Sequence, residues 1–301
     1  MSARAEPQRL TARLLRGMPL PDPDGGKEAR GRVLVIGGSS RVPGAALLAG
    51  TAALRSGAGK LQVATAQDVA LPFAVALPEA LVLGLPVDAR GGIVRGNAAL
   101  DDALAGADAV LVGPGMSPAP ATTTLVQRII RHATGTLVID AGALSPDLRA
   151  RPGAPYVLTP HAGEMAKLSG LEKSRVQREP QELALAFARR TRSVLVLKGA
   201  TTWIASPDGR LWLHPGGCRG LGTSGSGDVL AGLIAGLAAR CGDAVQAALW
   251  GVFVHAEAGR TLERSVGSLG FLAREIADPV PRLLDHLRRR GATVRTGSSA
   301  G

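Results

Sequence analysis

The stretch His214-Pro-Gly-Gly-Cys-Arg-Gly-Leu-Gly-Thr-Ser-Gly-Ser-Gly-Asp228 joins a short alternating strand to a helix of small and aliphatic residues. Its glycines Gly222, Gly225 and Gly227 permit positive φ and let a ligand approach the backbone without meeting side chains. The amides of Ser226, Gly227 and Asp228, which open the helix, would then be unpaired donors at the positive end of its dipole. The stretch therefore predicts an anion hole that could dock a phosphate, formed by Gly225, Ser226 and Gly227.

One carboxylate, Asp228, stands in the first turn of this helix. As a structural residue it would be an N-cap or first-turn acid, which is among the commonest uses of Asp. As a chemical group it could take a proton from a hydroxyl while the neighbouring amides hold a phosphoryl group in transfer. Spacing alone leaves both interpretations open.

The composition is that of a globular enzyme-sized domain. The chain has 301 residues, of which 46% are hydrophobic, enough for one large α/β core. Its formal net charge of +11 suits polyphosphate ligands, and nucleic-acid binding is not favoured because no aromatic stacking motif or zinc finger accompanies the charge.

The two cysteines form neither a disulfide framework nor a metal knuckle. With no signal peptide in residues 1–20 and no apolar run long enough to span a bilayer, we expect a cytoplasmic location without membrane association.

Apolar runs that alternate with helical patterns predict an α/β fold with a mainly parallel sheet, covered by helices on both faces. Two short segments, 203–205 and 211–214, joined by a Pro-Asp-Gly turn, predict an antiparallel hairpin at the sheet edge. We expect an N-terminal extension over 1–30, a single domain over 31–290 and a disordered tail over 291–301. The remaining strands are predicted at 32–36, 61–65, 80–83, 109–112, 137–140, 156–159 and 194–198.

Nearly every glycine-rich or polar cluster in the chain follows one of these predicted strands. In an open parallel sheet such loops gather along one edge, where ligands bind. We therefore expect them to form a single site together with the anion hole. The loops are 37–40, 113–116, 140–143, 159–164 and 198–202.

Seven motifs occur in order along the chain: GGSSRVPGAALLAG, AALRSGAGK, VGPGM, IDAGAL, LTPHAGE, VLKGATT and GSGDVLAGLIAGL. Between about Gly31 and Leu284 the chain thereby resembles the ADP/ATP-dependent NAD(P)H-hydrate dehydratase family, a branch of the ribokinase-like superfamily. The resemblance implies a three-layer α/β/α fold. It also implies repair of nicotinamide cofactor: the S epimer of hydrated NADH or NADPH is phosphorylated on its hydroxyl by ADP, giving AMP, and phosphate then leaves as the ring double bond returns.

The resemblance assigns roles to individual residues. Asp228 matches the essential carboxylate, which acts as the base and lies at the hydrate. The positions that match the hydrate site are Ala45, Gly115, His161 and Asp228. The positions that match the nucleotide site for ADP and AMP are Lys198, Gly199, Ala200, Thr201, Thr202 and Gly227.

Further implications concern cofactors and partners. The resemblance implies Mg²⁺, ADP or alternatively ATP as co-substrate, a homotetramer, and a separate epimerase, since this chain has no room for the epimerase domain that is often fused to such proteins. No metal ligands can be named from the sequence.

The chain departs from the family pattern at two positions. Ala162 stands where Pro is common, which should loosen the loop slightly. Ser224 stands in place of a glycine and would alter the anion hole if that position needs positive φ.

Two alternative functions remain open: a small-molecule kinase of the same superfamily, which uses the same Gly-Ser-Gly-Asp site, and a non-catalytic nucleotide-binding or nucleic-acid-binding protein.

Overall fold

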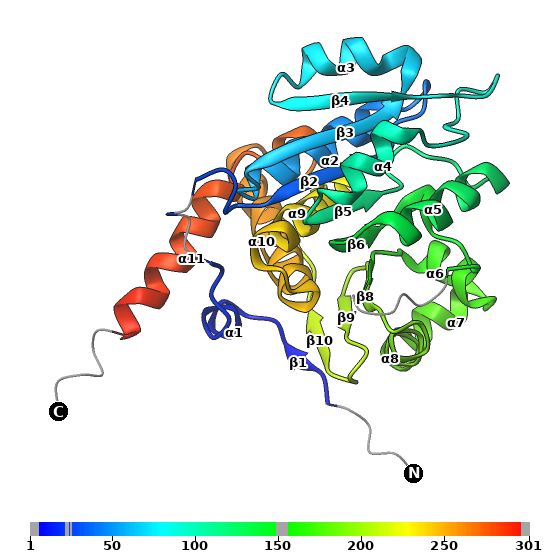
Figure 1. Ribbon diagram of the computed structural model, residues 1–301. Coiled ribbons are helices and arrows are strands. Elements are labelled where there is room, and N and C mark those ends of the chain that lie inside the picture. The colour runs from blue at the N-terminus through cyan, green and yellow to red at the C-terminus, as the bar shows by residue number, and fades with distance from the viewer. Residues whose placement is uncertain (1–5, 22–23, 25, 149–155, 296–301) are drawn as a thin grey trace.

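A computed structural model describes residues 6–21, 24, 26–148 and 156–295. One ten-stranded sheet runs through it in the order β1-β10-β9-β8-β7-β6-β5-β2-β3-β4 (Figure 1). Among the described strands only β9 runs antiparallel to its neighbours. The strands are β1 (Gln8–Arg9), β2 (Arg32–Ile36), β3 (Lys60–Ala66), β4 (Ala80–Leu85), β5 (Ala109–Val112), β6 (Thr136–Ile139), β7 (Tyr156–Leu158), β8 (Val194–Leu197), β9 (Thr202–Ala205) and β10 (Leu211–His214).

Helices cover both faces of the sheet and make three layers. The face packed by the larger core carries α1 (Ala12–Arg16), α2 (Pro43–Arg55), α3 (Ala70–Ala76), α9 (Ser226–Cys241), α10 (Ala244–Ser265) and α11 (Val280–Arg295). The opposite face carries α4 (Ala98–Ala105), α5 (Pro120–His132), α6 (Ala162–Ser169), α7 (Lys173–Arg178) and α8 (Pro180–Thr191). The three-layer α/β/α fold and the mainly parallel sheet are confirmed.

The central strands are apolar on both faces because both faces are covered. In β2, Val33 and Val35 belong to the larger core, whereas Leu34 and Ile36 belong to the other, and all four are fully buried. Successive side chains of a strand point to opposite faces, so a strand between two helical layers needs a continuous apolar run. This is the pattern from which the sheet was predicted.

The N-terminal segment is part of the domain, although it was predicted as an extension. β1 pairs in parallel with β10, so it lies outside the predicted antiparallel pair β9–β10. Leu10 and Leu15 are buried in the larger core. At the other end, α11 continues to Arg295, past the expected start of the tail at 291, and residues 296–301 lie outside the described part of the chain.

None of the described helices combines the length and the apolar character that a membrane crossing requires.

Candidate active site

The start of α9 has a glycine N-cap and free backbone amides, as the predicted anion hole requires, with one difference in its backbone. Gly225 is the N-cap residue with a φ of 90°, but Gly222 and Gly227 do not have positive φ. Ser224 does not have positive φ either, so replacing a glycine there causes no backbone strain of that kind. Ala162 opens α6 as its first residue, directly after its N-cap.

Two of the three predicted donors are free. The amide of Ser226 donates to the carbonyl of Thr223 at 3.3 Å. The amides of Gly227 and Asp228 have no acceptor among the described residues. They open a 16-residue helix, so the positive end of its dipole adds to their attraction for an anion.

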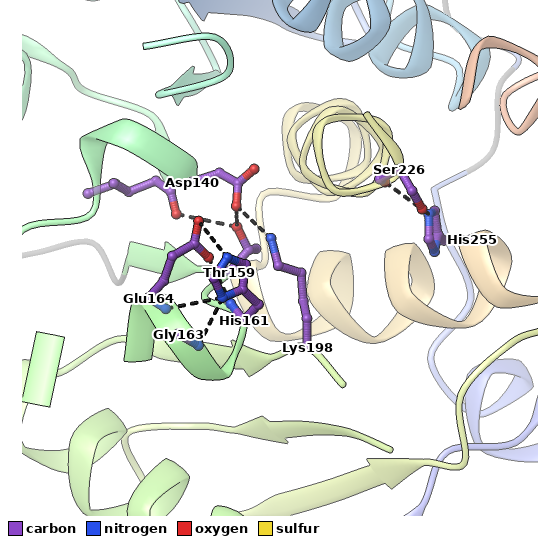
Figure 2. Close-up of polar contacts among 9 residues, drawn as sticks. Asp140, Thr159, His161, Gly163, Glu164, Lys198, Ser226 and His255 are labelled. Carbon is purple, nitrogen blue, oxygen red and sulfur yellow. Dashed lines mark hydrogen bonds and ion pairs between the residues drawn. The ribbon is translucent and has the colours of Figure 1, made fainter. Parts of the chain in front are cut away.

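A buried ion pair faces this helix start. Lys198 Nζ donates to Asp140 Oδ1 at 2.8 Å, and Thr159 Oγ1 donates to the same oxygen at 2.6 Å (Figure 2). A β-carbon added to Gly227 would lie only 3.3 Å from Lys198 Nζ, so the ammonium group lies beside the free amides. Burial opposes the charged form of Lys198, but the carboxylates around it outweigh burial and raise its pKa. The ammonium therefore stays charged and adds positive charge beside the free amides.

Asp228 is half-buried at the edge of this hole and holds its proton unusually tightly. Burial is the main reason, and the nearby carboxylates of Asp140 and Glu164 add to it, while Lys198 acts in the opposite direction. Together they raise the pKa of Asp228 to about 7. A carboxyl group with a pKa near the working pH is suited to general base catalysis.

His161 is the N-cap of α6, in a capping box with Glu164. Its Nδ1 accepts from the amides of Gly163 and Glu164 at 3.0 and 3.1 Å, and its own amide donates to Glu164 Oε2 at 2.8 Å (Figure 2). Its side chain remains 59% exposed. The structural and the ligand-binding interpretations are therefore compatible, because capping uses Nδ1, while Nε2 lies 3.6 Å from Glu164 Oε1 on a largely exposed ring.

The two remaining positions of the predicted hydrate site are neighbours. A β-carbon on Gly115 would lie 3.1 Å from that of Ala45 and 2.4 Å from the carbonyl oxygen of Val42. Gly115 has a φ of 69°, so both its conformation and its close packing against the start of α2 require glycine.

A cavity of about 680 Å³ lies beside the anion hole. It runs from the loop that follows β8 to the start of α9 and the middle of α10. All residues of the predicted nucleotide site except Thr201 line it, and so do all residues of the predicted anion hole except Gly225. The predicted residues that do are Lys198, Gly199, Ala200, Thr202, Ser226 and Gly227, with His161 at one end.

Two histidines that the sequence did not single out also line this cavity. His255 Nε2 lies 3.1 Å from both the hydroxyl and the carbonyl oxygen of Ser226 (Figure 2). Burial lowers the pKa of His255, and likewise that of His214, to about 4. Both rings are therefore neutral, and His255 secures the first residue of α9. Each lies in a local pattern typical of ordinary core residues, so no sequence signal distinguishes them.

Asp140 was also missed as a site residue, although the loop that it begins was predicted to join the site. It follows β6 and is 2% exposed. A lone Asp at the end of a strand carries no spacing signal, and its importance comes from Thr159 and Lys198, which follow two other strands.

Comparison with known proteins bears directly on this site. The family model described as NAD(P)H-hydrate dehydratase matches residues 33–282. The ADP-dependent (S)-NAD(P)H-hydrate dehydratase of Xanthomonas campestris is 61% identical over 280 residues, which cover 93% of this chain and 97% of that protein. The chain also spans about half the length of several bifunctional NAD(P)H-hydrate repair enzymes, such as 55% of the one from Moorella thermoacetica, with 39% identity.

Solved structures agree on the fold. The ADP/ATP-dependent NAD(P)H-hydrate dehydratase of Bacillus subtilis, co-crystallised with ATP and Mg²⁺, superposes with a TM-score of 0.81 and 31% identity, covering 94% of this chain and 99% of that one. Ribokinase of Thermotoga maritima, with a TM-score of 0.54 and 14% identity over 86% of this chain and 99% of that one, shares the fold alone. On the family match and the relative that covers nearly all of its length, this chain belongs to the NAD(P)H-hydrate dehydratase family.

Proposed function

We propose that this protein is an ADP-dependent (S)-NAD(P)H-hydrate dehydratase, which returns hydrated NADH or NADPH to the reduced cofactor while ADP is cleaved to AMP and phosphate. The observation that carries the proposal is Asp228, whose pKa is raised to about 7 beside two free amides and a charged lysine. A base and a phosphoryl-binding site in contact with each other are what a hydroxyl phosphorylation needs. The similarity to NAD(P)H-hydrate dehydratases identifies this hydroxyl as the one on hydrated NADH or NADPH.

In the first step the hydroxyl of the hydrate loses its proton to Asp228, and its oxygen attacks the β-phosphoryl group of ADP. The bond between that phosphorus and the bridging oxygen breaks, and AMP leaves with the electron pair. The amides of Gly227 and Asp228 and the ammonium of Lys198 hold the phosphoryl oxygens as charge develops on them. The cavity beside the anion hole is the proposed place for the adenylate.

In the second step the phosphorylated oxygen leaves the ring carbon as inorganic phosphate and takes the bonding electrons. The neighbouring ring carbon gives up a proton to water, and the double bond of the reduced nicotinamide returns. Phosphate is a far better leaving group than hydroxide, which is why a nucleotide is spent. The same anion hole that held the phosphoryl group now stabilises the departing phosphate.

The residues around the anion hole suit a magnesium ion carried by the nucleotide. Asp140 accepts both of its side-chain hydrogen bonds through Oδ1, which leaves Oδ2 without a donor among the described residues. Mg²⁺ prefers oxygen ligands and commonly binds one or two carboxylates together with substrate phosphates. Asp140 and Glu164 would hold it, and it would supply charge neutralisation of the diphosphate.

The assay mixes the purified protein with both epimers of NADH hydrate, Mg²⁺ and either ADP or ATP, and follows absorbance in the reduced-nicotinamide band. We expect absorbance to return only with nucleotide, with one phosphate released per NADH formed. The nucleotide that supports the reaction is then identified as the co-substrate.

Asp228→Asn should abolish turnover and keep nucleotide affinity, because it removes the base but not the amides. A stable phosphorylated hydrate without NADH would instead support the kinase alternative.

The proposal extends to assembly and location: a homotetramer in the cytoplasm, supplied with the S epimer by a separate epimerase. Its support is family membership and the existence of bifunctional repair relatives nearly twice as long. Sedimentation velocity of the purified protein tests the tetramer.

A further inference from the structure

A second cavity, of about 330 Å³, adjoins the proposed hydrate site and has no part in the chemistry above. Its lining includes Val42 and Met116. The carbonyl oxygen of Val42 would lie 2.4 Å from a β-carbon on Gly115, and Met116 is the next residue along the chain. The cavity therefore begins beside the proposed nicotinamide site, and it shares no lining residue with the nucleotide cavity.

Backbone hydrogen bonds join the loops that form its walls. The amide of Ser40 donates to the carbonyl of Gly91 at 2.9 Å, which ties the loop after β2 to the loop after β4. The amide of Ser39 donates to the carbonyl of Gly115 at 3.1 Å, which ties the first of these loops to the loop after β5. The walls are thus held in place before any ligand binds, as is usual for small-molecule sites.

The interior of the cavity is apolar in part. Ile93 is 4% exposed, and Met116 is partly buried. Val42 is 51% exposed, so its side chain is accessible at the mouth of the cavity. Together they offer a flat base a surface on which to pack.

The rim of the cavity is cationic. Arg41 and Arg90 both line it and are both exposed, and neither guanidinium has a carboxylate within ion-pair distance in the described part of the chain. Asp88 is the acidic residue in the lining, and its Oδ1 accepts the amides of Arg90 and Gly92, each at 2.9 Å. Those two donors partly compensate its charge, so the two arginines give the rim a net attraction for anions.

We propose that this cavity binds the adenylate half of the hydrated dinucleotide, with the base against Val42, Ile93 and Met116 and the phosphates on Arg41 and Arg90. The inference rests on the proposed function, because the nicotinamide half must lie at Ala45 and Gly115 for the other half to reach the cavity. A dinucleotide carries its diphosphate between the two halves, and guanidinium groups bind phosphate oxygens in a bidentate fork. An apolar wall beside cations matches a purine attached to phosphates.

The test is the double variant Arg41→Gln/Arg90→Gln, assayed with Mg²⁺ and ADP on two substrates. One is NADH hydrate, and the other is the hydrate of reduced nicotinamide mononucleotide, which lacks the adenylate half. We expect the KM for NADH hydrate to rise at least about tenfold, the scale of one lost charge-assisted contact. The KM for the mononucleotide hydrate and the KM for ADP should not change.

The matched control is Arg131→Gln, which removes an exposed arginine from the far end of α5 and should leave every constant unchanged. The proposal is overturned if the double variant keeps the wild-type KM for NADH hydrate. It is equally overturned if the KM rises as much for the mononucleotide, because the arginines would then act on the whole site and not on the adenylate half.

A binding measurement separates this inference from the proposed function. Calorimetric titration of NADPH into the protein, with saturating AMP to fill the nucleotide cavity, requires no turnover. We expect about tenfold weaker binding by the double variant at an unchanged thermal midpoint. Arginine-dependent binding without any dehydration would contradict the proposed function and support the cavity assignment. Dehydration with arginine-independent binding, or no NADPH binding by the wild type, would overturn the cavity assignment.

Discussion

At the scale of single residues, the proposed chemistry depends on the proton affinity of Asp228. Its pKa of about 7 means that the base is protonated, and inactive, at lower pH. We expect kcat/KM for the hydrate to fall about tenfold per pH unit below pH 7, since kcat/KM reports groups of the free enzyme.

Glu164→Gln keeps an acceptor for the capping box but removes a negative charge near Asp228, so the midpoint of the pH profile should move to lower pH. A midpoint that stays in place would contradict the assigned electrostatics.

The raised pKa also has a cost in folding stability. In the folded state Asp228 binds its proton more tightly than in the unfolded chain, so stability falls as the pH rises from 3.8 towards about 7. Asp228→Asn carries no charge and avoids this loss. At pH 8 without ligand we expect it to unfold at higher urea concentration than the wild type, by on the order of 1–2 kcal/mol, a value discounted from the full pKa difference because the group is half-buried. At pH 4 the two proteins should be nearly equal in stability.

At the scale of elements, the site depends on the close approach of α2 and α9, whose N-termini meet at the anion hole and the hydrate site. A β-carbon on Gly232 would lie 2.1 Å from the carbonyl oxygen of Ala49, closer than atoms can approach. Gly232→Ala must therefore push the helices apart, and we expect a loss of about 1–3 kcal/mol in urea unfolding. Gly44→Ala is the control, because nothing lies within 4 Å of its added carbon and alanine favours the helix. A stable Gly232→Ala protein would contradict this account of the packing.

At the scale of the whole molecule, the N-terminal segment is joined to the domain by side chains far along the chain. Trp250 Nε1 and Gln246 Nε2 donate to the carbonyl of Met18 at 3.0 and 2.8 Å, and Leu15 is fully buried. Leu15→Ala should cost about 2–5 kcal/mol, as for other buried leucines, and the protein should still unfold in one transition. The exposed Leu71 replaced by Ala is the control. Two separate transitions, or no loss of stability, would show that the segment is independent of the domain.

The parts of this architecture that the sequence predicts are those with a local cause. The buried strands follow from their apolar runs, and the start of α9, with a glycine N-cap and one acid in its first turn, follows from the glycines and the acid in its sequence. β1 was not predicted, because two residues, Gln8 and Arg9, carry no periodicity and become a strand only by pairing with β10. His255 was not predicted as a site residue, because only the packing of α10 against α9 brings it to Ser226.

The sequence by itself determined the α/β class, and it predicted the edge of the sheet that carries the site and the acid within it, because each depends on neighbouring residues in the chain. Only the tertiary structure decided the pKa of that acid. The pKa of Asp228 depends on burial and on Asp140, Lys198 and Glu164, which follow different strands. Electrostatic interactions depend on distance and burial in space, and those quantities exist only once the sheet has assembled.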